Sequence, residues 1–369
     1  MIFTAFMFSA DDHRFMARAL QLARRGLYTT TPNPRVGCVI ASGGRVLGEG
    51  WHQRAGAPHA EIEALAAAGA AARGATAYVS LEPCVHQGRT GPCARALIAA
   101  GVSRLVAAHA DPNPLVGGKG LAELAAAGIA VESGLLEEAA RELNIGFVTR
   151  MTRGRPWIRM KIAASLDGRT ALNNGMSRWI TGAAARRDGH AWRARACAVL
   201  TGIGTVRDDD PQLSVREVDT TRQPLRVVVD SRLETPPAAK VIAGGASLIA
   251  AAVDDAARRR ALQERGAEIF VCANAGGKVD LEALMRELAR RGMNEVHVEA
   301  GFKLNGSFLR EGLVDELVLY LAPHLIGDAA RGMFHLPELE DLKGKRALDV
   351  RDLRMVGDDI RVIARVANP

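Results

Sequence analysis

Three short segments in the first half of this chain constrain its fold most, because they carry metal-ligand side chains that would have to converge. These segments are His59-Ala60-Glu61, Pro83-Cys84 and Cys93. One imidazole and two thiolates form the ligand set of a catalytic zinc whose fourth position stays open to water. The pattern therefore predicts a fold that brings three separate segments to one ion.

The same segments predict where two helices begin. On an ideal helix the side chains of His59 and Glu61 point about 200° apart, so both can approach one ion only just beyond the helix N-terminus. Pro58 favours a helix start at that point. Cys93 likewise precedes an Ala-rich stretch, and the positive end of that helix dipole would favour a thiolate.

This arrangement predicts hydrolytic loss of an amine. Zinc acidifies its bound water, and Glu61, which is not a ligand, can take that proton and pass it to the departing amine. The pattern H-x-E followed by P-C-x-x-C is the signature of nucleobase deaminases. Here eight residues separate the two cysteines instead of two. The alternative, that Cys84 and Cys93 are ordinary small hydrophobic residues, is disfavoured by the presence of both elements.

The length of 369 residues predicts two domains, since single cores stop growing near 250–300 residues. Short apolar strands alternate with helices in both halves, which indicates two α/β folds. A basic stretch without apolar periodicity, residues 150–156, predicts the boundary, with domains at 10–152 and 153–369. Strands are expected at 36–40, 46–50, 77–81, 105–108, 157–163, 198–201, 225–230, 248–253, 268–272, 295–299 and 316–322, and helices at 11–26, 59–72 and 93–100.

Charge and composition narrow the class of ligand. The net charge of +7 favours anionic ligands. Aromatic residues make up only 4% of the chain and the basic residues are scattered among acidic ones, so a nucleic-acid groove is not indicated. The five cysteines do not resemble a secreted disulfide framework, and the apolar N-terminus lacks a basic leader. We expect a cytoplasmic protein that binds phosphorylated small molecules, with neither a nucleic-acid nor a membrane partner.

Further motifs in the first half carry a family resemblance. They are the segment from Thr31-Pro32-Asn33-Pro34 to Cys38 and the insert from Val85 to Pro92 between the two cysteines. The half resembles the cytidine-deaminase-like fold, a three-layer α/β domain, and nearly the whole chain resembles the bifunctional deaminase/reductases of riboflavin biosynthesis. The resemblance implies a diaminopyrimidinone substrate that carries a ribose 5-phosphate. It also implies that Asn33, His52 and His86 line the deaminase pocket.

In the second half, four predicted strands run into turns rich in glycine or acidic residues. The turns follow Ala163, Leu200, Val229 and Val298. Ligands of open α/β sheets sit beyond such strand ends. Gly301 and Gly306 would let a pyrophosphate approach backbone N–H groups at a helix N-terminus. A complete G-x-G-x-x-G is absent, so a standard dinucleotide fingerprint is not present.

The order of these motifs resembles the dihydrofolate-reductase-like domain of the same family, an α/β fold that uses NADPH. The resemblance implies two sets of contacts. The cofactor would face Ala163, Trp179, Thr205, Asp209, Ser231, Gly301, Phe302, Lys303, Leu304, Asn305, Gly306 and Ser307. The substrate would face Ser177, Arg193, Leu213, Arg216 and Glu299.

Residue type suggests roles for some of these positions. Arg193 and Arg216 can each form paired hydrogen bonds with phosphate oxygens. Ser231 and Arg232 can receive the 2′-phosphate of NADPH. Lys161 can act as a catalytic group that polarises or protonates the opened ribose, or it can pair with Asp167 or Glu299.

The leading hypothesis is thus a bifunctional enzyme of riboflavin biosynthesis with Zn²⁺ and NADPH as cofactors. Deamination of 2,5-diamino-6-ribosylamino-4(3H)-pyrimidinone 5′-phosphate would precede reduction of the ribosyl side chain to ribityl. The family also suggests a homo-oligomer. Three alternatives stay open: a nucleic-acid base deaminase with an accessory nucleotide-binding domain, a zinc-stabilised scaffold without catalysis, and a chain in which only one half is active.

Overall fold

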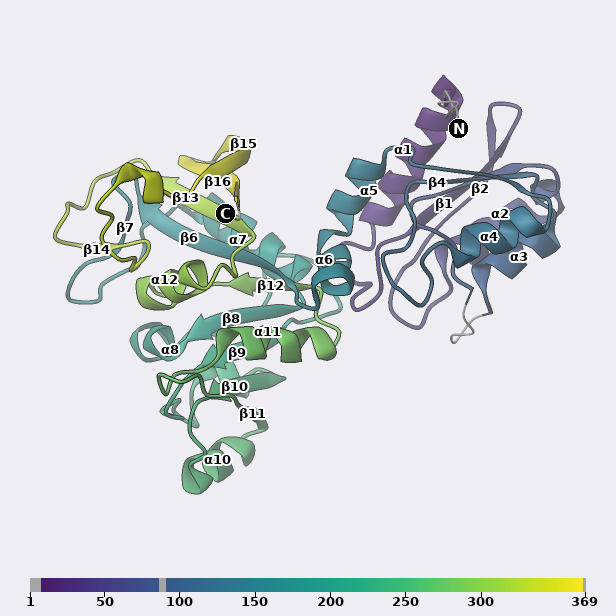
Figure 1. Ribbon diagram of the computed structural model, residues 1–369. Coiled ribbons are helices and arrows are strands. Elements are labelled where there is room, and N and C mark those ends of the chain that lie inside the picture. Colours follow the sequence, from purple (N-terminus) through teal and green to yellow (C-terminus); the bar gives the residue numbers. More distant parts are fainter. Residues whose placement is uncertain (1–7, 86–90, 368–369) are drawn as a thin grey trace. The chain divides into compact units, whose positions relative to one another are not determined.

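The computed structural model describes residues 8–85 and 91–367 and divides the chain into two compact units, residues 1–154 and 155–369. Both are α/β, as the alternating pattern predicts (Figure 1). None of the helices in the described ranges has the length and apolar character needed to cross a bilayer.

The first unit has a five-stranded sheet with the strand order β2-β1-β3-β4-β5. β1 pairs antiparallel with β2 and β3, whereas β3, β4 and β5 are parallel. The strands are β1 Gly37–Ser42, β2 Arg45–Trp51, β3 Thr76–Val79, β4 Arg104–Ala107 and β5 Ala130–Ser133. The helices are α1 Ala10–Arg24, α2 Ala60–Ala68, α3 Cys93–Ala100, α4 Lys119–Ala126, α5 Glu137–Leu143 and α6 Ile145–Arg153, with a 3₁₀ turn η1 at Gly69–Ala72.

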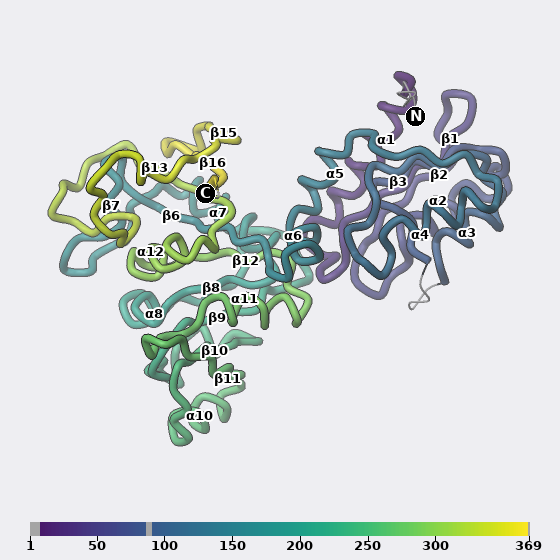
Figure 2. Tube along the Cα trace, in the orientation of Figure 1, coloured from purple at the N-terminus to yellow at the C-terminus, as the bar shows by residue number. Residues whose placement is uncertain are grey.

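Helices cover both faces of this sheet, so the unit has three layers. On one face α2, α3 and α4 lie side by side (Figures 1 and 2) and pack with Ile40, Val79 and Leu105. On the other face α1 and α5 pack with Val39 and Val106. Alternate residues of β1 therefore enter different cores, as the two-residue period of a strand requires.

The second unit is built on a nine-stranded sheet with the order β11-β10-β9-β8-β12-β6-β13-β16-β15. The strands are β6 Trp157–Ser165, β7 Arg169–Ala171, β8 Ala198–Gly202, β9 Leu225–Val229, β10 Ser247–Ala251, β11 Ala267–Val271, β12 Glu295–Val298, β13 Glu316–Ala322, β14 Arg331–Gly332, β15 Leu348–Val356 and β16 Asp359–Val366. The helices are α7 Ala183–Arg195, α8 Ile203–Asp209, α9 Lys240–Ala243, α10 Ala256–Gln263, α11 Leu281–Arg290 and α12 Phe302–Arg310, with a 3₁₀ turn η2 at Leu342–Gly344.

The strands from β11 to β13 are parallel, and β16 and β15 extend the sheet antiparallel. Apolar side chains of α11 and α12 cover one face, around Leu284, Met285 and Phe308. α8, α9 and α10 pack on the other face. The parallel strands β8, β12 and β6 are neighbours in the sheet, so their carboxyl ends lie at the same edge of the sheet.

Two sequence expectations need correction. The sequence predicts no periodic structure for residues 150–153, but they form the last turn of α6, whose buried face includes Phe147. The sequence also predicts no strand after residue 322, yet β15 and β16 form an antiparallel hairpin there.

Candidate active sites

In the first unit, the predicted metal ligands converge at the ends of two helices. His59 is the N-cap of α2, and Cys93 is the first residue of α3. The ligand atoms of His59, Cys84 and Cys93 all lie within 4.8 Å of one another. The Nδ1 atom of His59 is 3.3 Å from the Cys93 sulfur and 3.5 Å from the Cys84 sulfur. A set of one imidazole and two thiolates at this spacing fits zinc with one open position.

Glu61 lies in the first turn of α2 and is only 3% exposed. Burial raises the pKa of its carboxyl to about 7, and the neighbouring His59 opposes this shift. By contrast, hydrogen bonds from Cys93 and His59 lower the pKa of Cys84, so that sulfur is disposed to be a thiolate. The centre thus combines a potential thiolate ligand with a carboxyl group suited to move a proton near neutral pH.

Two of the three residues expected to line the deaminase pocket lie together beside the metal ligands. The side-chain nitrogen of Asn33 is 3.0 Å from Nε2 of His52, and Nδ1 of His52 is 3.0 Å from the carbonyl oxygen of Pro58. The rings of His52 and His59 meet edge to face at 5.3 Å. Asn33 and His52 therefore adjoin the predicted centre. His86 lies outside the described residues.

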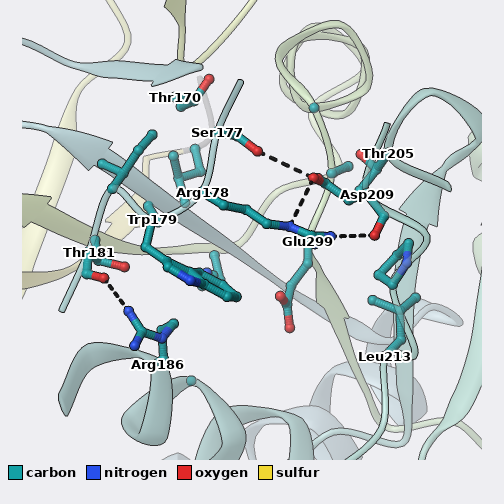
Figure 3. Close-up of a pocket in the computed structure, with 18 of the residues that line it drawn as sticks. Thr170, Ser177, Arg178, Trp179, Thr181, Arg186, Thr205, Asp209, Leu213 and Glu299 are labelled. Atoms are coloured by element: carbon teal, nitrogen blue, oxygen red, sulfur yellow. Dashed lines mark hydrogen bonds and ion pairs between the residues drawn. The ribbon is translucent and has the colours of Figure 1, made fainter. Parts of the chain in front are cut away.

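In the second unit, a cavity of about 740 Å³ is lined by residues of β6, by α8, which follows β8, and by the turn after β12. Figure 3 shows residues that line it. A volume of this order suits a small-molecule or cofactor site. Twelve of the predicted residues line it: Lys161, Ala163, Ser177, Trp179, Arg193, Thr205, Asp209, Leu213, Arg216, Glu299, Gly301 and Phe302. They come from segments that are far apart in sequence, and the parallel strand order brings them to one edge.

The floor of this cavity carries charged side chains. Arg193 of α7 donates two hydrogen bonds to the carboxylate of Glu299, at 2.5 and 2.9 Å. Burial lowers the pKa of Lys161, and the nearby Glu299 opposes that shift. The Arg193 guanidinium therefore already has a carboxylate partner, whereas the sequence predicts a phosphate partner for it.

The wall of the cavity is rich in cationic groups. Arg178 lies 3.4 Å from Asp209, to which Ser177 also donates a hydrogen bond (Figure 3). Arg186 lies over the indole ring of Trp179, and Trp179 is 70% exposed. Gly301, the N-cap of α12, brings the positive end of that helix to the cavity. These features fit a ligand that bears phosphate groups, such as NADPH.

The remaining predicted cofactor contacts do not line the cavity. Lys303, Leu304, Asn305, Gly306 and Ser307 continue along α12 behind Gly301, and the Ser231 hydroxyl accepts a hydrogen bond from the backbone N–H of Val279. Packing explains why a glycine stands at position 306, because an added Cβ would lie 2.1 Å from the carbonyl oxygen of His335. This glycine therefore lets α12 pack closely against the backbone at His335.

Sequence reasoning missed several residues of the cavity wall: Thr181, Arg186, Arg187, His190, Lys240 and Arg331. Arg186, Arg187 and His190 belong to α7, whose position over the strand ends is a tertiary feature. Arg331 follows a long irregular segment. The sequence does contain a sign of two of these residues. The acidic run Asp208–Asp210 follows a predicted strand and turn, and in the structure Asp210 pairs with Lys240 and Asp208 with Arg331.

Comparisons with known proteins divide the chain in a similar way. Residues 9–109 match the family model of the cytidine and deoxycytidylate deaminase zinc-binding region, and residues 156–362 match that of the RibD C-terminal domain. Riboflavin biosynthesis protein RibD of Escherichia coli (strain K12) is 48% identical over 362 residues, which cover 95% of this chain and 98% of that protein. The protein of the same name from Haemophilus influenzae is 46% identical over 367 residues, 96% and 97% of the two chains.

Two solved structures superpose on nearly the whole of this chain. Acinetobacter baumannii RibD, form 1, superposes with a TM-score of 0.91 at 43% identity, covering 97% of this chain and 99% of that one. A protein from Thermotoga maritima superposes with a TM-score of 0.86 at 32% identity, with the same coverage. Its title describes a diaminohydroxyphosphoribosylaminopyrimidine deaminase/5-amino-6-(5-phosphoribosylamino)uracil reductase.

Proposed function

This chain belongs to the RibD family, and we propose that its two activities divide between residues 10–152 and residues 153–369. It is a bifunctional deaminase and reductase of riboflavin biosynthesis, with a zinc-binding deaminase domain and an NADPH-dependent reductase domain. The metal ligands all lie in the first unit and the large cavity lies in the second. That separation supports one reaction in each unit.

The proposed substrate is the one that the Thermotoga maritima protein is named for. In the first step the amine of 2,5-diamino-6-ribosylamino-4(3H)-pyrimidinone 5′-phosphate is replaced by oxygen from water, and ammonia leaves. In the second step the ribosyl side chain is reduced to ribityl, which gives 5-amino-6-ribitylamino-uracil 5′-phosphate. The cationic cavity wall supports a phosphorylated substrate for the second step.

The observation that carries the deaminase assignment is the convergence of His59, Cys84 and Cys93 beside the buried Glu61. These three residues would hold zinc, which when bound acts as a Lewis acid on water. Glu61 would accept a proton at its carboxylate and deliver it to the departing amine. Asn33 and His52 would form part of the pocket wall, where their side chains can hydrogen bond to the pyrimidine.

For the reductase step, NADPH when bound supplies the hydride. Lys161 would donate a proton or a hydrogen bond to the oxygen of the opened sugar, and Glu299 and Arg193 would hold that end of the substrate. Thr205, Asp209, Trp179 and Gly301 would lie against the cofactor. Arg216 is exposed and its partners are the neutral side chains of Gln212 and Ser214, so its positive charge suits the substrate phosphate better than that of Arg193.

The Glu61→Gln variant tests the division of labour. It keeps the shape of the side chain but removes the proton acceptor, so ammonia release should fall by at least about a hundredfold. NADPH oxidation with the deaminated intermediate should stay at the wild-type rate. Glu63→Gln, a carboxylate removed from the same helix, is the matched control. Loss of both activities in Glu61→Gln would refute the proposed separation.

We also propose a homo-oligomer, formed with a second copy through strand β15. This strand is at the edge of the nine-stranded sheet and exposes Leu348, Val350, Leu353 and Met355. Exposed apolar edge strands tend to pair with other chains. Light scattering should give a multiple of the chain mass, and a Leu353→Asp, Met355→Asp double variant should give the monomer mass.

Finally, we propose that the protein works in the cytoplasm, where the thiols of Cys84 and Cys93 stay reduced, and that it binds neither nucleic acid nor membrane. Incubation with tRNA or single-stranded DNA should leave the mobility of either nucleic acid unchanged in a gel. A tight complex would instead support a nucleic-acid deaminase.

A further inference from the structure

One buried carboxylate next to the predicted metal centre has no part in the reaction described above. Glu82 follows β3 and stands two residues before Cys84, and it is only 3% exposed. Its backbone N–H donates to the carbonyl oxygen of His109 at 3.0 Å. A buried carboxylate needs several hydrogen-bond donors, because removing its charge from water is costly.

Four backbone N–H groups meet this need. Oε2 of Glu82 accepts from Asp111 and Gly118, both at 2.9 Å, and Oε1 accepts from Gly120 at 2.8 Å and Leu121 at 3.3 Å. All four donors belong to residues 111–121, the segment that leads into α4 and forms its first turn. A single side chain thus holds this whole segment against the turn that carries Cys84.

The start of α4 depends on this contact. Its N-cap, Gly118, has a left-handed φ of 79° and no side chain, so the helix has no cap of its own. The Glu82 carboxylate instead accepts from Gly120 and Leu121 in the first helical turn, at the positive end of the helix. α4 is therefore capped by a residue of the metal-ligand turn.

The contact is also tight enough to fix the backbone. An added Cβ at Gly120 would lie only 2.1 Å from the carbonyl oxygen of Pro83. On the other side, the carbonyl oxygen of Cys84 accepts a hydrogen bond from the N–H of Ala94 in α3 at 3.2 Å. Residues 82–84 are therefore held between the starts of α3 and α4.

From these contacts we propose that Glu82 is a positioning residue for the metal centre: it fixes the backbone that presents the Cys84 sulfur, without touching the reacting atoms. The proposal rests on the zinc site described above. Groups that orient a ligand from outside the coordination sphere commonly change metal affinity by about 10- to 100-fold. Replacing the carboxylate should therefore weaken zinc binding as well as slow deamination.

The test compares Glu82→Gln with Glu123→Gln in the full-length protein. Glu123 is a carboxylate of α4 itself, but it pairs with Arg95 near the surface. Zinc affinity is measured by competition with a chromophoric chelator. We expect the dissociation constant of Glu82→Gln to rise by about tenfold or more and that of Glu123→Gln to stay within about twofold of the wild type. Wild-type affinity in a folded Glu82→Gln protein would overturn the proposal.

A second variant covers the case in which Glu82→Gln does not fold. Gly120→Ala keeps the carboxylate but pushes on the carbonyl of Pro83, so it should also weaken zinc binding, and unchanged affinity would count against the proposal. Cobalt substitution gives a readout besides activity, since a displaced Cys84 would alter the thiolate absorption bands. A wild-type protein that bound no zinc would instead refute the metal site itself.

Discussion

The guanidinium of Arg193 and the carboxylate of Glu299 form a two-bond ion pair at the floor of the second unit's cavity. Both side chains are largely buried, at 16% and 14% exposure. Arg216, at the wall of the same cavity, is exposed. Two arginines that look equivalent in the sequence therefore have different partners. Replacing Arg193 should lower the stability of the unit, whereas replacing Arg216 should weaken substrate binding.

Replacing Arg193 by Leu should destabilise the second unit by about 3 kcal/mol, because the buried Glu299 carboxylate loses the two hydrogen bonds from its main cationic partner. Arg216→Ala should change stability by less than about 0.5 kcal/mol but raise the KM of the reductase step. Urea unfolding followed by tryptophan fluorescence measures the first effect, since Trp157, Trp179 and Trp192 all lie in this unit. Equal losses of stability in the two variants would contradict the structural difference.

Replacing Lys161 by Met should lower kcat of the reductase step by about 10²- to 10⁴-fold, the usual contribution of an acid–base group. Ammonia release should be unaffected. Lys240→Met is the control, because Lys240 lines the same cavity but pairs with Asp210. If Lys161→Met instead raised only KM, the residue would bind substrate without taking part in catalysis.

Removing the metal should separate the two activities. Protein treated with a chelator, or carrying Cys93→Ser, should lose ammonia release and keep NADPH oxidation on the deaminated intermediate. Cys272→Ser should retain zinc, because Cys272 is a half-buried thiol of the second unit. Metal analysis should give about one zinc per wild-type chain. Zinc retained in full by Cys93→Ser would show that this thiol is not a ligand.

Stability of the first unit should depend on pH through Asp12. Burial opposes ionisation of this carboxyl, but hydrogen bonds from Arg104, Tyr78 and Ser9 outweigh it and hold the pKa well below its usual range. A lowered native pKa stabilises the fold above the unfolded pKa of about 4, and that stability is lost as the pH falls below it. Asp12→Asn should therefore cost about 2 kcal/mol at pH 7.

The cost should shrink at pH 3, where the wild type begins to lose the same contribution. Asp11→Asn is the control, since Asp11 is exposed on the same helix. Chemical unfolding at both pH values measures the difference. A cost that stayed the same at pH 3 would show that the Asp12 charge is not what stabilises the unit.

Some features were predictable because one local pattern carries them. H-x-E, Pro-Cys and the Ala-rich stretch after Cys93 each predict a helix start or a ligand, and the structure brings the ligands together. The strand ends that line the cavity were also visible, since each apolar run is followed at once by a turn.

Other features depend on partners that are distant in sequence. Arg159 lies inside a predicted strand, yet it is buried between Glu295 and Glu316, more than a hundred positions away. Nothing near Arg159 indicates that pairing. The strand β15 alternates charged and apolar residues that are mostly exposed, so it shows no core-facing pattern. The role of Glu82 likewise needs four N–H groups from another segment.

The most direct test of a two-step enzyme follows ammonia and NADPH in one reaction. Wild-type protein loaded with zinc is mixed with 2,5-diamino-6-ribosylamino-4(3H)-pyrimidinone 5′-phosphate and excess NADPH. We expect one ammonia released for each NADPH oxidised, with ammonia appearing first. Oxidation of NADPH without release of ammonia, or no ammonia at all from zinc-loaded protein, would contradict the proposed sequence of reactions.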